Sequence, residues 1–457
     1  DSINGEAGAD LIDGGDGNDT LDGSFGNDSI YGSTGDDQLT DSQGSNLLDG
    51  GDGTDRLSSK ALTGNHSLLG GLGNDQLLSI GQNIVLDGGN DQDALLATGR
   101  LSQNNVETFV QRGSATLIGG AGDDNDLISA YADNYAYYWS GIKASHLENA
   151  LLQGNDGNDR LYVEYTNNST LQGGLGSDSL QVFAANWYRQ QLGTGFSSSH
   201  RLDGGDDNDS LLVNGVCAYW DGRTDLVLDG GSGNDSLLVN ESTIVNNYGA
   251  YTTASLAGGD GDDTLSASGV LQLTLSGGTG RDTFALTALQ YKATQASFNF
   301  TTDNLGGSVA VAGKPIEITD FQAGLGGDLL DLKDLLENAA VGYDGSNPFG
   351  SSGYLKLTQS LDNPADTWLQ FDVDGGANSF ITLAVLKNIT PDSLVAANFY
   401  PAFEPSGSGL NGQQILGTPD PDTLRGTAGD DSIDGLGGND SINGEAGADL
   451  IDGGDGN

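Results

Sequence analysis

A nine-residue repeat is the feature of this sequence that most constrains its fold. From Gly5 the chain reads in consecutive nonads, beginning GEAGADLID, GGDGNDTLD and GSFGNDSIY, and residues 417–452 read in the same way. Most nonads begin with glycine, carry aspartate at the sixth position and place a large apolar residue at the eighth. Short periods of this kind are typical of solenoids, in which each repeat packs only against its neighbours.

The net charge calls for a counter-charge that the chain itself does not supply. Asp and Glu number 65 against 16 Lys and Arg, a formal charge of −49. Self-repulsion of this size opposes compaction, yet the apolar residues keep a fixed period. We therefore expect an ordered fold neutralised by divalent cations. So acidic a surface argues against nucleic acid and anionic membranes as partners. No apolar run approaches the roughly 18–20 residues that span a bilayer.

The consensus G-G-x-G-x-D-x-U-x, with U a large apolar residue, resembles the calcium-binding parallel β-roll repeat of the repeats-in-toxin (RTX) proteins. The resemblance implies an all-β fold, a parallel β-roll or β-solenoid with Ca²⁺-binding Gly/Asp turns. In that family two nonads form one coil, so alternate aspartates are expected to stack about 4.8 Å apart. Carboxylates at that spacing repel by roughly 3–4 kcal/mol at an effective dielectric constant near 20. Folding and metal binding are therefore expected to be one event.

Each letter of the nonad has a physical reason. Glycine lets the backbone adopt left-handed conformations in a tight turn and bring its carbonyl groups inward. Aspartate supplies a hard oxygen ligand and the carbonyls supply more, which suits the six to eight oxygens of a Ca²⁺ site. The apolar residue lies on the short strand after the turn and packs into a narrow interior.

The predicted calcium ligands are the sixth-position aspartates, which are Asp10, Asp19, Asp28, Asp37, Asp55, Asp75, Asp93, Asp159, Asp178, Asp209, Asp235, Asp263, Asp282, Asp422, Asp431, Asp440 and Asp449. One Ca²⁺ for each of these 17 residues would neutralise about 34 of the 49 excess charges. Asn46 and His66 occupy the sixth position of two nonads, where we expect weak or empty sites. In GGAGDDNDLIS, Asp124 and Asp126 compete for the role.

The distribution of nonads predicts five regions: a nonapeptide β-roll at 1–58, a longer-rung solenoid at 59–284, an insert at 285–403, a linker at 404–416 and a second β-roll at 417–457. In the longer-rung solenoid we expect one Gly/Asp turn per coil, with variable excursions on the other side. The insert reads as a small mostly-β (α+β) domain, in which Leu329–Ala340 is the predicted helix.

The insert resembles the C-terminal capping and type I secretion target region that follows the nonads in RTX proteins. Two stretches carry this resemblance, EITDFQAGLGGDLLDLKDLL at Glu317–Leu336 and, further on, LQFDVDGGANSFITLAVLKNIT. Another nonad array follows it here, so the expected role is capping and spacing. Asp372 and Asp374, in DVDGG, form either a further calcium site or a strand-end turn.

Aromatic residues cluster in the excursions, where they serve packing, assembly or stacking on sugars. They are Tyr135, Tyr137, Tyr138, Trp139, Trp187, Tyr188, Tyr219 and Trp220. The single cysteine, Cys217, excludes an intramolecular disulfide. The zinc-protease motif H-E-x-x-H and the nucleophile elbow G-x-S-x-G are both absent from the sequence. We therefore expect no enzymatic activity.

An exact internal repeat predicts the larger architecture. Asp440–Asn457 repeats Asp1–Asn18 letter for letter. Identity at surface and core positions alike indicates near-identical units of about 439 residues within a longer polypeptide. We expect a calcium-stabilised extracellular unit of a bacterial surface fibre, sheath, S-layer or long adhesin, which folds on Ca²⁺ after export. Its expected partners are identical units and, as a further class, glycans. The alternatives are an adhesin stalk with its binding tip elsewhere, or the carrier portion of a secreted enzyme or toxin.

Overall fold

A computed structural model divides the chain into two compact units. Unit 1 comprises Asp1–Thr253 and Asn299–Val309, and unit 2 comprises Ala254–Phe298 and Ala310–Asn457. The structure describes residues 1–61, 64–81, 83–98, 100–103, 106–109, 113–124, 127–131, 147–164, 166, 168–183, 198–215, 223–240, 251–301, 308–350, 352–407, 414–426, 431–445 and 449–456.

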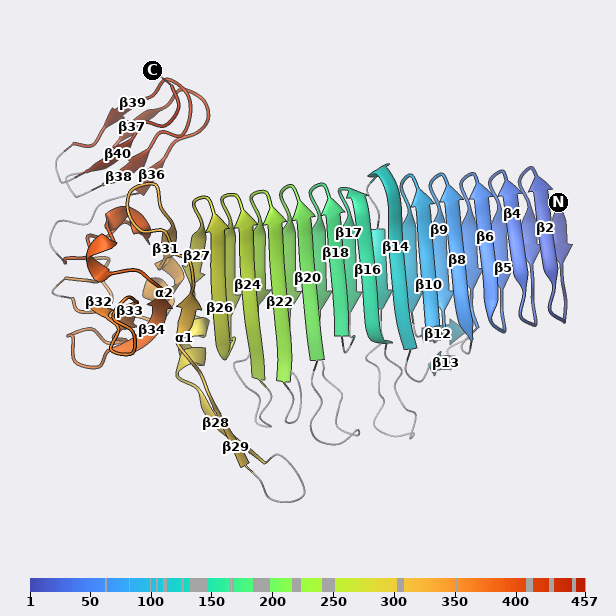
Figure 1. Cartoon of the computed structure of the whole chain (residues 1–457), viewed down its shortest axis with the longest axis horizontal. Helices are drawn as coiled ribbons and strands as arrows, with labels where there is room; N and C mark the ends of the chain where they lie inside the picture. Colours follow the sequence, from blue (N-terminus) through green and yellow to red (C-terminus); the bar gives the residue numbers. More distant parts are fainter. Residues whose placement is uncertain are drawn as a thin grey trace. The chain divides into compact units, whose positions relative to one another are not determined.

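Unit 1 is a solenoid of two parallel sheets (Figure 1). One sheet contains β1 (Ser2–Asn4), β3 (Thr20–Asp22), β5 (Gln38–Asp41), β7 (Arg56–Ser59), β9 (Gln76–Ile80), β11 (Ala94–Thr98), β15 (Leu127–Tyr131), β17 (Arg160–Glu164), β19 (Ser179–Phe183), β21 (Ser210–Asn214) and β23 (Ser236–Asn240). The other contains β2 (Leu11–Asp16), β4 (Ser29–Thr34), β6 (Asn46–Asp52), β8 (Asn65–Leu72), β10 (Asn83–Asn90), β14 (Gly113–Asp124), β16 (Leu147–Gly157), β18 (Asn168–Leu175), β20 (Ser198–Asp206) and β22 (Arg223–Ser232). A separate antiparallel hairpin joins β12 (Arg100–Gln103) to β13 (Val106–Phe109). The strand β24 (Tyr251–Asp260) crosses the boundary between the units.

Two nonads form each coil of the N-terminal solenoid. Ser2 of β1 pairs with Thr20 of β3, and Leu11 of β2 pairs with Ser29 of β4. Both partners lie eighteen residues apart, which is twice the nonad. The expected all-β solenoid with two nonads per coil is therefore confirmed.

The core of unit 1 is a narrow stack of aliphatic side chains. In each short strand every second residue points inward, so that Leu161 and Val163 of β17 are buried while their neighbours are partly exposed. Equivalent residues of successive coils lie directly above one another, as in the column Leu161, Leu180, Leu211 and Leu237. The opposite sheet contributes Leu152, Leu171, Leu202 and Leu228, all fully buried. Each buried leucine contributes roughly 1.5–3 kcal/mol, so the stack stabilises every coil against the next.

Close packing of the coils explains the second glycine of the nonad. Gly71 has a φ of +115°, and a Cβ on it would lie 2.1 Å from the carbonyl oxygen of Gly51 in the preceding coil. A side chain there would combine backbone strain with a clash. The second position therefore favours glycine, although Ser33 and Asn155 adopt the same left-handed conformation there, with φ of +81° and +82°.

Unit 2 contains further parallel strands, two helices and an antiparallel sheet. Its elements are β25 (Thr264–Ser268), β26 (Gln272–Thr279), β27 (Thr283–Leu286), α1 (Ala288–Thr294), β30 (Ile316–Ile318), β31 (Leu329–Asp331), α2 (Lys333–Asn338), β32 (Leu355–Gln359), β33 (Thr367–Phe371), β34 (Ile381–Leu386), the short 3₁₀ turns Pro391–Ser393 and Ala396–Asn398, and β35 (Phe399–Tyr400). The strands β28 (Ser297–Thr301) and β29 (Ser308–Ala312) cross the unit boundary. The C-terminal nonads form β36 (Gln414–Leu416), β37 (Thr423–Arg425), β38 (Ser432–Asp434), β39 (Ser441–Asn443) and β40 (Leu450–Asp452).

The predicted helix at Leu329–Ala340 is only partly correct. The structure has a helix at Lys333–Asn338, whereas Leu329–Asp331 forms β31, which pairs in parallel with β27 and β35. Leu330 is fully buried and pairs with Phe284, so packing against an existing strand outweighs the local helical pattern. The coiled parallel pairing thus continues past Phe284. The five predicted regions and their boundaries stay predictions.

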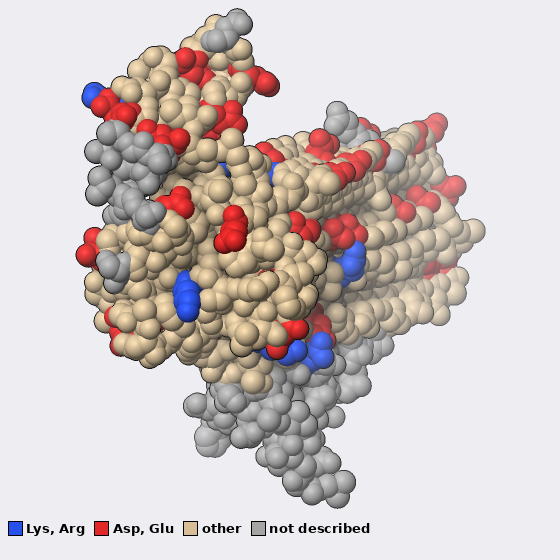
Figure 2. Space-filling view, turned by 60° about the vertical axis from the view of Figure 1, so that its left-hand side comes forward, with Lys and Arg blue, Asp and Glu red and all other residues tan. Residues whose placement is uncertain are grey.

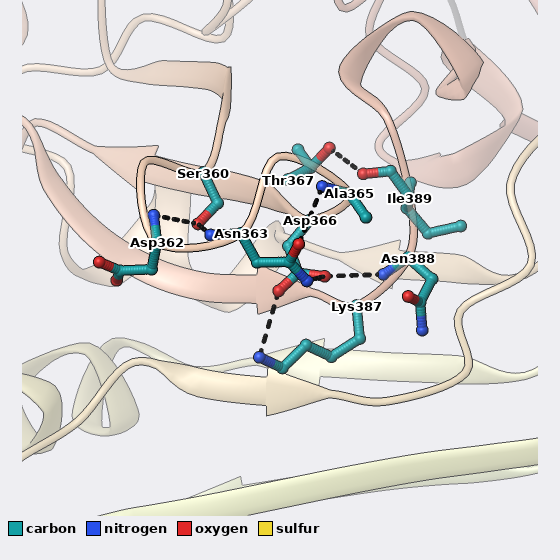
Figure 3. A network of polar contacts seen from close by, with 9 residues as sticks. All are labelled: Ser360, Asp362, Asn363, Ala365, Asp366, Thr367, Lys387, Asn388 and Ile389. Carbon is teal, nitrogen blue, oxygen red and sulfur yellow. Dashed lines mark hydrogen bonds and ion pairs between the residues drawn. The ribbon is translucent and has the colours of Figure 1, made fainter.

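A buried carboxylate stabilises the antiparallel part of unit 2 (Figure 3). Asp366 is 2% exposed and accepts hydrogen bonds from the Asn388 N–H at 3.0 Å and from Lys387 Nζ at 3.2 Å. Burial alone would raise the pKa of Asp366, but these donors hold it below its usual value. This aspartate therefore has its counter-charge within the chain.

Truncation of one core leucine should separate core packing from surface effects. Leu180→Ala removes a fully buried side chain, whereas Leu175, 50% exposed and five residues earlier, serves as the matched control. We expect Leu180→Ala to lower the free energy of unfolding by about 2–5 kcal/mol and Leu175→Ala to change it by less than about 0.5 kcal/mol. Urea unfolding at saturating Ca²⁺ measures both. Equal effects would contradict the inward assignment of Leu180.

Candidate calcium-binding turns

The sixth-position aspartates form hydrogen-bonded ladders along the turns. In each case the backbone N–H of one aspartate donates to Oδ1 of the aspartate one coil further on. Asp178, for example, donates to Asp209 and Asp209 donates to Asp235, each at 2.7 Å. We call this series in unit 1 the long ladder; it comprises Asp19, Asp37, Asp55, Asp75 and Asp93, then Asp159, Asp178, Asp209 and Asp235.

Unit 2 contains ladders of the same kind. Asp263 donates to Asp282 at 3.0 Å, and among the C-terminal nonads Asp422 donates to Asp440 and Asp431 to Asp449. On the other edge of unit 1, Asp10 donates to Asp28 at 2.8 Å and Asp28 donates to Asn46 at 3.0 Å; we call this the short ladder. All 17 predicted ligands thus take part in one ladder or another.

In many of these aspartates the second carboxylate oxygen is buried without a hydrogen bond. This holds for Oδ2 of Asp10, Asp19, Asp28, Asp37, Asp55, Asp75, Asp178, Asp209, Asp282 and Asp440. Asp55, Asp178 and Asp282 are at most 3% exposed. Burying an unpaired ionised oxygen costs several kcal/mol unless a counter-charge meets it. The repetition of one unsatisfied atom coil after coil points to a ligand that binds at each of them.

The unpaired oxygen points at the first glycine of its own nonad. A Cβ on Gly173 would lie 2.1 Å from Asp178 Oδ2 and 2.4 Å from the carbonyl oxygen of Gly204 in the next coil. The same arrangement recurs at Gly32, where Asp37 Oδ2 and the Gly50 carbonyl lie 2.4 and 2.5 Å from such a Cβ. The absence of a side chain therefore leaves a space bordered by carboxylate and carbonyl oxygens, which are the ligands that Ca²⁺ prefers.

The donor set combines carboxylates with the backbone. Within the part of the chain that the structure describes, no cluster of three or more metal-ligating side chains occurs. A cation in these turns is therefore held by one or two carboxylates together with backbone carbonyls, as a hard oxygen-seeking ion allows. Calcium supplies the positive charge that these turns lack.

The pKa values of the ladder carboxyls show the missing counter-charge. Burial, and secondarily the neighbouring aspartates, raise the pKa of Asp55 and Asp282 to about 6, of Asp75 and Asp209 to about 7, and of Asp178 to about 8. Without a cation, the folded turn favours the protonated carboxyl over the carboxylate. Asp366, with a lysine beside it, has the opposite shift.

Acidic side chains also line the outer surface of the turns (Figure 2). Asp16, Asp36 and Asp52 are exposed at successive coils. Fifth-position side chains form an outer ladder of their own, in which the N–H of Asp36 donates to Asn18 Oδ1 at 3.1 Å. These surface carboxylates are hydrated, so their charge costs less than that of the buried sixth position.

The two predicted exceptions behave differently from the aspartates. His66 is buried, with Nδ1 at 2.8 Å from Ser59 Oγ and Nε2 at 3.0 Å from the Ala61 carbonyl. Burial lowers its pKa, and both ring nitrogens are occupied, so His66 offers no free ligand. The amide nitrogen of Asn46 donates a hydrogen bond to Asp41 Oδ1. Asp124 ends β14, and Asp126 lies outside the described residues.

Sequence reasoning missed two carboxylates of these turns. Asp328 extends the unit 2 ladder, because Oδ1 accepts the Asp282 N–H at 3.0 Å. The signal was present in AGLGGDLLD, Ala323–Asp331, a nonad that lacks only its first glycine. Its Oδ2 accepts the N–H of Gln322 at 2.7 Å, so the ladder ends on a satisfied oxygen. The second, Asp41, is 3% exposed, and burial followed by the Asp28 carboxyl raises its pKa to about 7.

The alternatives at Asp372 are also informed by hydrogen bonds. Asp372 Oδ2 accepts the N–H groups of Asn378 and Ser379 at 2.9 and 3.0 Å. Burial would raise the pKa of Asp372, but these two donors lower it. Oδ2 thus anchors the turn after β33, as the strand-end interpretation requires, whereas Oδ1 is buried without a hydrogen-bond partner, as the calcium interpretation requires; both stay predictions. The aromatic clusters, from Tyr135 to Trp220, lie outside the described residues.

Comparison with known proteins supports this assignment of the turns. A family model described as RTX calcium-binding nonapeptide repeat (4 copies) matches residues 1–30, 31–62, 149–164, 248–269 and 416–451. No curated protein matches the chain in sequence. RTX nonapeptide repeats bind calcium ions, and proteins that carry them are typically secreted. Of the helices in the described ranges, none has the length and apolar character needed to cross a bilayer.

Removing one ladder carboxylate should have opposite effects with and without calcium. In Asp178→Asn the like charge beside Asp159 and Asp209 disappears, so the metal-free protein should become more stable. With Ca²⁺, loss of a charged ligand should weaken that site by about tenfold or more, the equivalent of roughly 1.5–3 kcal/mol. Circular dichroism without metal measures how much strand structure forms, and thermal unfolding with Ca²⁺ and a Ca²⁺ titration measure the effect on the complex. The control, Asp156→Asn, changes an exposed residue of the preceding coil's turn and should alter neither. A stability change of the same sign in both states would refute the assignment.

The raised pKa values fix the sign of the pH dependence. Without metal, the folded state holds protons that the unfolded chain releases above its pKa of about 3.9, so stability falls as pH rises from about 4 to about 8. Each such group contributes at most about 1.4 kcal/mol per pH unit. Metal-stripped protein should therefore gain strand structure on acidification from pH 8 to pH 5, whereas the Ca²⁺ complex should lose calcium affinity. Circular dichroism melts across this range test both, and loss of structure by the stripped protein at pH 5 would be the contrary result.

Proposed function

The chain carries RTX calcium-binding nonapeptide repeats, and from this premise we propose that it is one unit of an extracellular tandem-repeat protein. The proposed role is structural: a calcium-stabilised segment of a bacterial surface fibre, sheath, S-layer or long adhesin. It is exported unfolded by a type I system at low cytosolic calcium, and folds outside the cell when Ca²⁺ fills the turns. The role needs no catalytic group.

The identity of the two terminal sequences, together with their strand pairing, carries the proposal. β39 has the sequence SIN and pairs with β37 at an offset of eighteen residues. β1 has the same sequence and the same pattern of exposure, and pairs with β3 at the same offset. A strand common to both arrays can therefore pair with β37 on one side and β3 on the other. Successive tandem copies of the chain then share one uninterrupted solenoid.

Exposure at the first coil supports the same arrangement. Leu11 of β2 is 77% exposed, and within the described residues β2 pairs only with β4. Its counterpart in the identical sequence, Leu450 of β40, pairs with Ser432 of β38 and is only partly exposed. An array of the preceding unit, placed like β38, would cover this edge. Covering an unpaired edge strand also protects it from uncontrolled association.

The ladder itself can continue from copy to copy. The N-terminal amine of Asp1 contacts Oδ1 of Asp19, which repeats the N–H contact found between other ladder aspartates. Because Asp440–Asn457 repeats Asp1–Asn18, the residue that follows Asn457 in a series of 439-residue repeats is the counterpart of Asp19, which completes the nonad GGDGNDTLD. Identical copies in series therefore keep both the nine-residue period and the column of carboxylates.

A tandem of two copies, in which Asn457 of the first is followed directly by Asp19 of the second so that the shared eighteen residues occur once, tests the proposal. After metal removal it should be an expanded chain by small-angle scattering, and Ca²⁺ should convert it into a rod that associates end to end or side by side in electron micrographs. The matched control inserts Gly-Ser at the joint, which shifts the nine-residue period by two residues. We expect that control to bind Ca²⁺ but to bend at the joint.

The outcomes separate the candidate roles. A rod that stays monomeric at high concentration would refute self-assembly and favour the role of an adhesin stalk. Folding of the stripped tandem with Mg²⁺ alone, or with no divalent ion, would refute the coupling of calcium to folding. A tandem without the insertion that bends like the Gly-Ser control would refute the shared solenoid.

A further inference from the structure

One nonad departs from the consensus at two positions that compensate for each other. DSQGSNLLD, Asp41–Asp49, has aspartate where other nonads begin with glycine, and Asn46 where they have their sixth-position aspartate. The carboxylate has thus moved from the sixth position to the first. The nonad lies in the short ladder, directly after Asp28.

The displaced carboxylate faces that of the preceding coil. A Cβ on Gly23 would lie 2.4 Å from Asp41 Oδ2 and 2.8 Å from Asp28 Oδ2, so both oxygens border the same small space. Asp28 is 1% exposed and Asp41 is 3% exposed. Neither Oδ2 has a hydrogen-bond partner. Two unpaired carboxylate oxygens therefore meet inside the turn, where other coils bring one carboxylate oxygen together with a glycine carbonyl.

The other atoms of the two departures hold this arrangement in place. Asn46 Oδ1 accepts the Asp28 N–H, as a sixth-position carboxylate would. Its amide nitrogen donates to Asp41 Oδ1 and to the Gln43 carbonyl, the latter at 3.2 Å. Asp41 Oδ1 also accepts the Gln43 N–H at 3.0 Å. These contacts occupy Asp41 Oδ1. Oδ2 is therefore the oxygen of Asp41 that is left for a ligand.

We propose that Asp41 supplies a second carboxylate to the divalent cation of the calcium class that Asp28 binds, so that the short ladder keeps a complete site although Asn46 has replaced its next aspartate. Two carboxylates in a buried space repel each other unless a cation lies between them. Hard oxygen ligands from two side chains suit Ca²⁺, with backbone carbonyls and water completing its coordination.

The neighbouring coil explains why the ladder stops here. The next sixth position holds His66, whose two nitrogens contact Ser59 and Ala61, and the one after it holds Ile84. Among the described residues of this edge, the Asp28–Asp41 site is therefore the last one with a carboxylate in the ladder. It depends on these residues alone, and stands whether or not the solenoids associate.

Counting bound calcium in the whole chain tests the site. Native mass spectrometry at a fixed low free Ca²⁺ concentration should find one ion fewer in Asp41→Asn than in the unchanged protein. The control, Asp52→Asn, removes the same charge from an exposed position of the next turn and should leave the count unchanged. An unchanged count in Asp41→Asn would overturn the proposal.

A crystal structure of the unchanged protein grown with Ca²⁺ gives an independent reading that does not depend on the variant folding. Anomalous scattering should show a peak bonded to Oδ2 of both Asp28 and Asp41. If instead the two oxygens lie within about 2.6 Å of each other with no peak, they share a proton in a short hydrogen bond, and the cation site is refuted.

Discussion

The structure depends on a buried aspartate of which only one oxygen is satisfied within the protein. Oδ1 of Asp209 accepts the N–H of Asp178, which fixes the spacing of adjacent coils, whereas Oδ2 faces the first glycine of its own nonad and a carbonyl of the next coil. That glycine cannot be replaced, because any Cβ would fill the space that the oxygen borders. The remaining charge must be met by a cation, since burial without one raises the pKa of Asp209 to about 7. Glycine, aspartate and calcium are thus three parts of one constraint.

The two edges of unit 1 meet this constraint differently. The long ladder keeps an aspartate through nearly every described coil. On the other edge the equivalent position changes from Asp28 to Asn46, His66 and Ile84, and later to Ala115. Once the inward residue is apolar, the turn needs no cation, and the edge is free to accept longer connections between strands. We therefore expect calcium to stabilise one edge along most of unit 1, while the leucine and valine stack holds the two sheets together between the edges.

Much of the fold and of the candidate calcium turns could be predicted, because each nonad carries the glycine, aspartate and apolar residues that form one turn and one strand. The nine-residue period predicts a solenoid, and the family resemblance predicts two nonads in each coil. All 17 predicted ligands lie in ladders. What the sequence concealed depends on tertiary contacts. Leu329–Asp331 has a helical pattern but forms a strand, because Leu330 packs beside Phe284. Asp328 was overlooked because one alanine replaces a glycine in its nonad, and Asp41 because it stands at a glycine position. That Asp41 could compensate for Asn46 follows only from their contact across the turn.

The end of the unit 2 ladder shows what a cap of such a solenoid requires. Each coil leaves one oxygen for a cation, so a ladder that ended on an ordinary nonad would leave a half-built site at its edge. Asp328 avoids this, because the N–H of Gln322 occupies the oxygen that would otherwise need calcium. The amide of Asn398 donates to the Asp328 carbonyl at 2.8 Å and to the Gly324 carbonyl at 3.2 Å, which ties the same turn to the 3₁₀ segment that follows. These hydrogen bonds fix the geometry of the last coil, although burial still raises the pKa of Asp328. In a solenoid each repeat gains its stability from the neighbour already in place, so this hydrogen-bonded turn provides a packing surface for the coil that precedes it.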